Sequence, residues 1–266
     1  MTVNPRTSDS NGRLWGARAE DWANIQEPVH KPIYQSVFDA TQLVHGVRYL
    51  DVGCGSGLAV QIADARGAIA SGLDAAQELL EIAQSRTPNA SFQVGDLEAL
   101  PFEDGAYDLV TGFNSFQYAG NPALALAEAK RVVSDNGSVV IATWGEPEGM
   151  EAASVVAALK PLMPPPPPGT PGPFALSDEN ALRDFAKQAS LHPVEVFDVD
   201  SPFEYTNLET AVLGLSSAGV AAKVIEAVGV DLVENAYRDA IAGFVQTDGS
   251  VKIAATFRCL VATPNK

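Results

Sequence analysis

The chain has 266 residues, 46% of them hydrophobic, so it is long and apolar enough to bury a sizeable core. Its net charge of −16 argues against nucleic acid and anionic membrane surfaces as partners. No apolar run approaches the length of a membrane span or a signal peptide, and the three histidines and two cysteines form no metal-binding pattern. We therefore expect a cytoplasmic protein with no membrane insertion, no metal and no nucleic acid partner. The oligomeric state is not indicated by the sequence.

Predicted helices and strands alternate over the first 145 residues. Residues 1–12 are expected to be disordered, and the apolar positions that follow predict helices broken at Pro28 and Pro32. The whole segment 1–39 is interpreted as a helical lid. The alternation over residues 40–145 predicts an α/β fold with a doubly wound parallel sheet. Its strands are predicted at 47–52, 68–73, 91–95, 107–113 and 138–143.

Two insertions are expected after residue 145. Residues 146–176 contain a helical stretch and the run Pro164–Pro168, which favours an extended conformation. This run is interpreted as a stiff loop or, alternatively, as a docking site for a proline-binding partner. Residues 207–247 are rich in alanine and valine and predict a helical cap.

Further core elements are predicted beside these insertions. Residues 177–206 predict a helix with Ser177 as its N-cap, followed by a strand over 194–205. Residues 248–266 contain a turn and a long closing strand over 251–261. The two strands are expected to complete the sheet.

A glycine-rich turn follows the first predicted strand, in the sequence Leu-Asp-Val-Gly-Cys-Gly-Ser-Gly at residues 50–57. Gly53, Gly55 and Gly57 permit backbone angles that a side chain would forbid, and they let a ligand lie directly on the main chain. A dinucleotide-binding turn requires Gly or Ala where this chain has Leu58. The turn therefore disfavours NAD.

Three aspartates end the first three predicted strands. Asp51, Asp74 and Asp96 are separated by almost equal lengths of chain, about what a strand, a helix and a return require in a parallel sheet. Their side chains are expected side by side at the carboxyl edge, where such sheets bind ligands.

These stretches resemble the class I S-adenosylmethionine-dependent methyltransferases, in particular the ubiquinone and menaquinone C-methyltransferases. The resemblance covers roughly residues 40–145, is specific for fold and cofactor, and does not identify the methyl acceptor. It implies a doubly wound, seven-stranded Rossmann-like sheet, mostly parallel with an antiparallel last strand, under a helical cap built from the insertions. The matching stretches are residues 50–57, 72–74, 95–102, 107–110 and 131–137.

The resemblance implies S-adenosylmethionine as cofactor and S-adenosylhomocysteine as product, and it assigns the cofactor contacts. Asp74 would accept from the ribose hydroxyls, Asp96 from the adenine amino group, and the Leu97 amide would donate to an adenine ring nitrogen. Asp74 as a helix N-cap and Asp96 as a loop cap are the alternatives. The expected cofactor-binding residues are Asp51, Gly53, Cys54, Gly55, Gly57, Asp74, Ala75, Asp96, Leu97 and Asn114.

Aromatic residues are the candidates for the acceptor site, since an apolar or aromatic acceptor needs apolar walls. The alternative is that they are ordinary core residues. His30 and Tyr34, one helical turn apart, are the candidates for proton transfer, and a solvated histidine beside a core tyrosine is their alternative. The expected acceptor-lining residues are Trp15, Trp22, Tyr34, Phe116, Tyr118, Trp144, Phe203 and Tyr205.

The favoured function is transfer of a methyl group to a small, apolar or aromatic metabolite by in-line displacement, with an oxygen, nitrogen or carbon acceptor. One alternative is an enzyme that binds the same cofactor for a cyclisation or decarboxylation. Another is a non-catalytic scaffold that recruits a partner through Pro164–Pro168.

Overall fold

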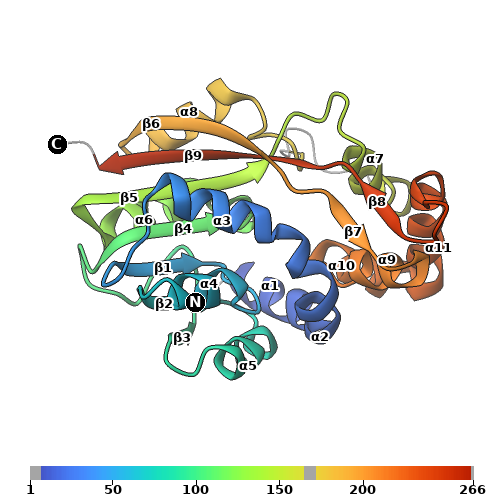
Figure 1. Cartoon of the computed structure of the whole chain (residues 1–266), viewed down its shortest axis with the longest axis horizontal. Coiled ribbons are helices and arrows are strands. Elements are labelled where there is room, and N and C mark those ends of the chain that lie inside the picture. Colours follow the sequence, from blue (N-terminus) through green and yellow to red (C-terminus); the bar gives the residue numbers. More distant parts are fainter. Residues whose placement is uncertain (1–6, 165–171, 265–266) are drawn as a thin grey trace, which may run out of the picture.

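The computed structural model describes residues 7–164 and 172–264, and a seven-stranded sheet lies at its centre (Figure 1). The strand order is β3-β2-β1-β4-β5-β9-β6, and all neighbours run parallel except β9, which is antiparallel to β5 and β6. This confirms the expected mostly parallel sheet. The strands are β1 (Arg48–Val52), β2 (Ile69–Asp74), β3 (Ser91–Val94), β4 (Tyr107–Phe113), β5 (Val133–Trp144), β6 (Leu191–Asp200) and β9 (Thr256–Pro264).

Helices cover both faces of the sheet, which divides the apolar core in two. On one face α3 (Lys31–Ala40) and α4 (Leu58–Ala65) pack over β1, and their core includes Phe38 and Tyr49. On the other face α6 (Pro122–Val132) and α8 (Glu179–Gln188) bury Leu126 and Leu182. The helix α5 (Gln77–Arg86) connects β2 to β3. The strand order reverses between β1 and β4, which places a crevice at their carboxyl ends.

The remaining elements gather beyond the carboxyl ends of β1, β4 and β5 (Figure 1). A small antiparallel sheet is formed there by β7 (Phe203–Tyr205) and β8 (Val251–Ile253). It adjoins α7 (Ala152–Ala157), α9 (Leu208–Ser216), α10 (Gly219–Val228) and α11 (Val230–Ile241). The insertions and the N-terminal helices α1 (Thr7–Gly16) and α2 (Ala19–Asp21) therefore lie at the edge where the glycine turn is found.

Two strand predictions were wrong because the chain leaves the main sheet. The predicted strand 194–205 is divided into β6 and β7, since Pro202 has no N–H for a ladder and the Ser201 hydroxyl donates to the Val29 carbonyl at 2.6 Å. The predicted strand 251–261 is divided into β8 and β9. Between them, Ala254 N donates to a Glu151 carboxylate oxygen at 2.6 Å, so this residue turns toward α7.

Two local predictions near the helix starts also need correction. Residues 7–12 are helical, as part of α1, because the helix packs closely on the core: a Cβ on Gly12 would lie 2.3 Å from the Ala75 carbonyl oxygen. The N-cap of α8 is Asp178, whose carboxylate accepts from Ala181 N at 2.8 Å, whereas Ser177 is buried just before it. Most of the predicted proline run, residues 165–168, lies outside the described residues.

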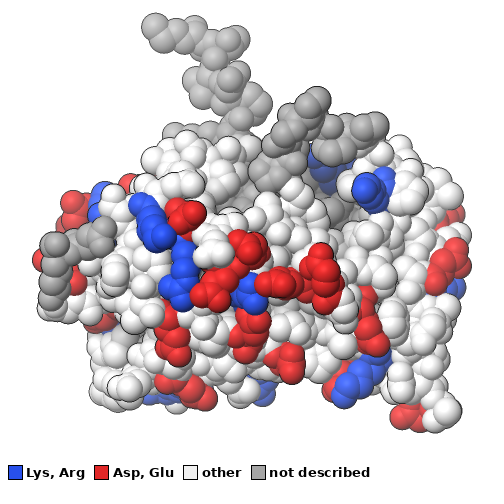
Figure 2. All heavy atoms as spheres, turned by 90° about the horizontal axis from the view of Figure 1, so that it is seen from above, with Lys and Arg blue, Asp and Glu red and all other residues white. Residues whose placement is uncertain are grey.

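The surface over β6 carries acidic side chains with basic side chains among them (Figure 2). Arg258, on β9, pairs there with Asp198 at 2.8 Å and Glu146 at 3.0 Å. Within residues 7–164 and 172–264, no single helix is long and apolar enough to cross a membrane. The helices α9 and α10 reach that length and composition only together, and they meet at an angle of 89°.

Candidate functional site

Adjoining cavities lie at the carboxyl ends of β1 and β4. The first has a volume of about 120 Å³ and is lined by the glycine turn, the ends of β2 and β3, and α1. The second has a volume of about 720 Å³ and is lined by the end of β5, the insertions and the cap. Among the described residues, both cavities share five lining side chains, which mark the junction between them: Trp15, Trp22, His30, Asn114 and Tyr118.

The glycine turn presents bare main chain to the first cavity. Gly53 and Gly55 line it with φ angles of +76° and +56°. A Cβ on Gly53 would lie 2.5 Å from the Ser115 Cβ, and one on Gly55 would lie 3.2 Å from Trp22 Nε1. Trp22 Nε1 is buried without a hydrogen-bond partner among the described residues. A buried unpartnered donor beside an exposed main-chain turn fits a polar ligand.

Asp74 faces the first cavity from the end of β2. One carboxylate oxygen accepts from Gly55 N at 2.9 Å and the other from Ala76 N at 2.8 Å, just before α5. Burial raises the pKa of Asp74, and these amide donors oppose the shift. Each oxygen keeps a further lone pair, so the carboxylate can still accept from two hydroxyl groups. Ala75 also lines this cavity.

Asp96 and Leu97 line the first cavity beyond β3, where α1 covers them. Ser8 Oγ donates to Asp96 at 3.1 Å, and Asn11 Nδ2 donates to the Tyr118 carbonyl at 2.8 Å. Ligand pockets usually measure about 300–1,000 Å³, well above the 120 Å³ found here. We therefore expect side chains of α1 to shift when a nucleoside binds.

Three of the predicted cofactor residues lie behind the cavity wall. Asp51 is 2% exposed and accepts from Thr111 Oγ1 at 2.7 Å, and burial raises its pKa to about 8. Cys54 is buried against Gly72, and Gly57 precedes α4 with a φ of +80°. None of the three lines either cavity.

Asn114 stands at the junction in a left-handed conformation, with a φ of +53°. Its N–H donates to the Ala142 carbonyl at 2.8 Å, and its side-chain oxygen accepts from Gln117. A non-glycine residue held in this region is strained, and such strain is concentrated at functional sites.

Six of the eight aromatic candidates line one or both of the two adjoining cavities. Trp15, Trp22 and Tyr118 line both, Tyr34 lines the first, and Trp144 and Phe203 line the second. Phe116 and Tyr205 line neither of them. Phe116 is 1% exposed and packs beneath Gly112 in the core, and the Tyr205 hydroxyl donates to Gln26 Oε1 at 2.8 Å.

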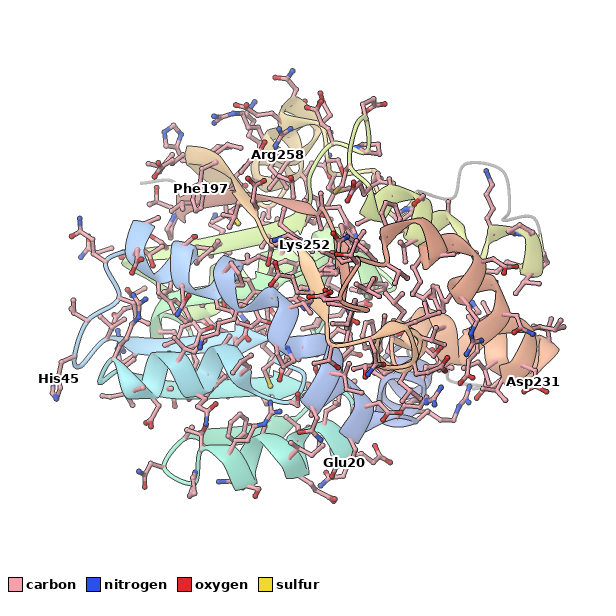
Figure 3. The ribbon with its side chains drawn as sticks, turned by 45° about the vertical axis from the view of Figure 1, so that its right-hand side comes forward. Glu20, His45, Phe197, Asp231, Lys252 and Arg258 are labelled. Atoms are coloured by element: carbon pink, nitrogen blue, oxygen red, sulfur yellow. The ribbon has the colours of Figure 1, made fainter. Side chains whose placement is uncertain are left out.

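His30 and Tyr34 are both buried, so a solvated histidine is the wrong interpretation of His30. Burial lowers the pKa of His30 to about 4, although the carbonyls of Glu27 and Gln26 oppose the shift. Burial raises the pKa of Tyr34. His45 lies exposed at the opposite edge of the sheet, away from both cavities (Figure 3).

A buried ion pair that the sequence analysis missed fastens the lid to the glycine turn. The Glu27 carboxylate accepts from Arg86, from Ser56 Oγ at 2.5 Å and from Leu58 N at 3.3 Å. Arg86 also donates to the carbonyls of Ser56 and Ala23. The partners are 59 residues apart, and no local pattern marks them. Within the described ranges, no group of three or more His, Cys, Asp or Glu side chains could hold a metal ion.

Comparisons with known proteins agree with this geometry. The methyltransferase domain family matches residues 50–141. A malonyl-[acyl-carrier protein] O-methyltransferase from Geobacter sulfurreducens is 33% identical over 185 residues, which cover 67% of each chain. The chain belongs to the S-adenosylmethionine-dependent methyltransferase family. A demethylmenaquinone methyltransferase from Renibacterium salmoninarum is 35% identical to this methyltransferase over 111 residues, which are 42% of this chain and 47% of the relative. The match spans only 34% and 47% of the length of the first two curated relatives.

Solved structures share the fold of this methyltransferase at low sequence identity. A methyltransferase in complex with the Haloferax volcanii Trm112 activator superposes with a TM-score of 0.60 at 20% identity, covering 99% of this chain and 100% of the other. The [4+2]-cyclase SpnF superposes with a TM-score of 0.57 at 17% identity, covering 87% and 80%. At such identities the likeness shows the fold alone, and methylating and cyclising enzymes both use it.

Proposed function

We propose that this protein transfers a methyl group from S-adenosylmethionine to a small, uncharged, mostly apolar acceptor. The observation that carries the proposal is the junction at which the glycine-turn cavity opens beside the larger one, between Trp22, His30 and Asn114. Two ligands, one bound in each cavity, would meet at this junction. Holding two reactants in line can lower the barrier of a displacement by about 7–11 kcal/mol.

The residues of the first cavity fit the cofactor. Asp74 would hold the ribose hydroxyls, Asp96 and Leu97 the adenine, and the main chain at Gly53 and Gly55 the methionine part. The cofactor supplies a methyl carbon activated by a positively charged sulfur. The protein would exclude water from that carbon with the described parts of the lid (residues 7–39), the insert (residues 146–164 and 172–176) and the cap (residues 207–247).

The second cavity supports an uncharged acceptor. Among its described lining residues there is no Asp, Glu, Lys or Arg, although the chain carries 50 such residues. A carboxylate, phosphate or ammonium group bound there would be buried without a charged partner, which is costly. The Geobacter relative is named for malonyl-[acyl-carrier protein], and a malonyl carboxylate would find no basic side chain among the described lining residues.

Calorimetry with S-adenosylmethionine and NAD, followed by mass analysis of reactions with a panel of metabolites, tests the proposal. We expect binding of the methyl donor alone, and S-adenosylhomocysteine formation with uncharged aromatic or apolar acceptors. Turnover confined to charged acceptors would contradict the acceptor class. Cyclisation or decarboxylation with the same cofactor is the alternative, and conversion of a substrate without S-adenosylhomocysteine formation would favour it.

A further inference from the structure

Very few groups that can exchange a proton face the larger cavity. Among its described lining residues the ionisable side chains are His30, Tyr118 and Tyr237. Burial raises the pKa of Tyr118 to about 12 and also raises that of Tyr237, so neither tyrosine forms an anion near neutral pH. His30 is therefore the lining side chain that can take up a proton there.

His30 is held at the place where the acceptor and the methyl donor would meet. It ends the short 3₁₀ turn Glu27–His30 and lines both cavities. Its ring stacks on Trp22 at 5.9 Å and meets the edges of Phe203 and Phe257 at 5.9 and 5.4 Å. Rings on three sides fix its orientation without forming a hydrogen bond to it.

The two ring nitrogens of His30 have different surroundings. Nδ1 is enclosed by protein and has no hydrogen-bond partner among the described residues. We assign the proton of the neutral ring to Nδ1, the enclosed nitrogen, which leaves the lone pair on Nε2. Within the described chain no hydrogen bond engages Nε2, and Nε2 is not enclosed. The lone pair of Nε2 is thus available at the junction.

We propose that His30 Nε2 holds the hydroxyl group of the acceptor and takes its proton, so that the acceptor is a neutral phenol or alcohol. This assignment rests on the proposed function. The hydroxyl proton passes to Nε2, the oxygen forms its new bond to the methyl carbon, and the electron pair of the broken carbon–sulfur bond stays on sulfur. Positive charge passes from sulfur to the imidazole, which later releases the proton to water.

Burial lowers the pKa of His30 to about 4, so His30 would take the proton only as the new oxygen–carbon bond forms and makes that proton strongly acidic. The product imidazolium would stack on the face of Trp22, which attracts a cation. One positive charge is present at the junction before and after the step, so the buried site gains no net charge. An aliphatic amine acceptor would enter as an ammonium ion and find no carboxylate among the described lining residues, whereas a neutral aryl amine is left to the test below.

The first test measures binding to the protein without a methyl donor, using naphthalene, 2-naphthol and 2-methoxynaphthalene as probes. We expect wild type to bind 2-naphthol about 3–10-fold more tightly than the other two, the worth of one net hydrogen bond. The preference should disappear in His30→Phe. The matched control Phe203→Leu removes apolar contact from the same cavity and should weaken all three probes while the ratio persists. A preference that survives in His30→Phe, or that is absent in wild type, overturns the proposal.

The second test separates holding the hydroxyl from taking its proton. His30→Gln keeps a hydrogen-bond acceptor but cannot accept the proton. We expect it to retain the 2-naphthol preference while S-adenosylhomocysteine formation from 2-naphthol falls by about 100-fold or more. Undiminished turnover in His30→Gln overturns the proton-transfer role, and wild-type turnover with 2-naphthylamine but not 2-naphthol overturns the hydroxyl class. Failure to bind S-adenosylmethionine would contradict the proposed function. It would leave the probe-binding result at His30 unaffected, because that test uses no methyl donor.

Discussion

The Glu27–Arg86 pair gives the sharpest prediction about stability. The Glu27 side chain is 2% exposed and the Arg86 side chain 21% exposed, so removing Arg86 leaves a buried carboxylate with only Ser56 and Leu58 as donors. Breaking a buried pair from one side costs about 3–5 kcal/mol. We expect Arg86→Met to lower the free energy of unfolding by about this amount at pH 8.

The loss of stability caused by Arg86→Met should depend on pH. Burial already raises the pKa of Glu27, and loss of the arginine raises it further. A carboxyl group whose folded pKa lies above its unfolded value stabilises the fold at low pH and loses that contribution as the pH rises through the folded pKa. The deficit of Arg86→Met should therefore be smaller at pH 5 than at pH 8. Adding Glu27→Gln should recover part of the loss, since it removes the stranded charge.

Urea unfolding followed by tryptophan fluorescence measures these free energies, with the slope checked for two-state behaviour. The matched control is Arg183→Met, which removes an exposed pair with Glu179 at 2.8 Å and should cost about 0.3–0.5 kcal/mol. If Arg86→Met cost no more than Arg183→Met, or the same at both pH values, the assignment of a buried, coupled pair would be refuted.

Three further predictions concern the site. Asp74→Ala should weaken S-adenosylmethionine binding by about 1.5–3 kcal/mol in calorimetry, because it removes a charged acceptor, and an unchanged Kd would exclude Asp74 from the site. Trp144→Ala should raise the KM for the acceptor or lower kcat while cofactor affinity stays within a few-fold. An equal loss of cofactor affinity and of acceptor turnover would contradict the place of Trp144 in the acceptor cavity. Burial raises the pKa of Asp51 to about 8, so the wild type should lose stability relative to Asp51→Asn as the pH rises from 5 to 8. The expected loss is at most about 1.4 kcal/mol per pH unit. Melting curves of the two proteins that change in parallel with pH would refute this.

The parts of the fold with local signals were predictable from the sequence. The glycine turn and the aspartates that end β1 and β2 follow from strand length and turn chemistry, so the sheet and Asp74 could be found without a structure. Pro202 was also a local signal, because proline cannot continue a ladder of strand hydrogen bonds. The predicted strand 194–205 nevertheless ran through it. The break at residues 254–255 had no such signal because it depends on Glu151 from a distant segment.

The site was predictable only where neighbours in sequence are also neighbours in space. Phe116 and Tyr118 lie two residues apart, yet the 3₁₀ turn that carries them sends one into the core and the other to the junction. Periodicity does not distinguish these outcomes in so short an element. The pairing of Glu27 with Arg86 likewise depends on how the lid packs, which a single sequence does not encode locally.

The position of β9 has a consequence for how the protein is made. In the sheet, β9 lies between β5 and β6, so neither strand has its neighbour on that side until β9 has been synthesised. The ribosome delivers β6 well before β9, with β7, α9, α10, α11 and β8 in between. During that interval two strand edges remain open, and open edges promote pairing with other chains. We expect nascent chains stalled before Thr256 to be held by chaperones or to aggregate, whatever the stability of the finished fold.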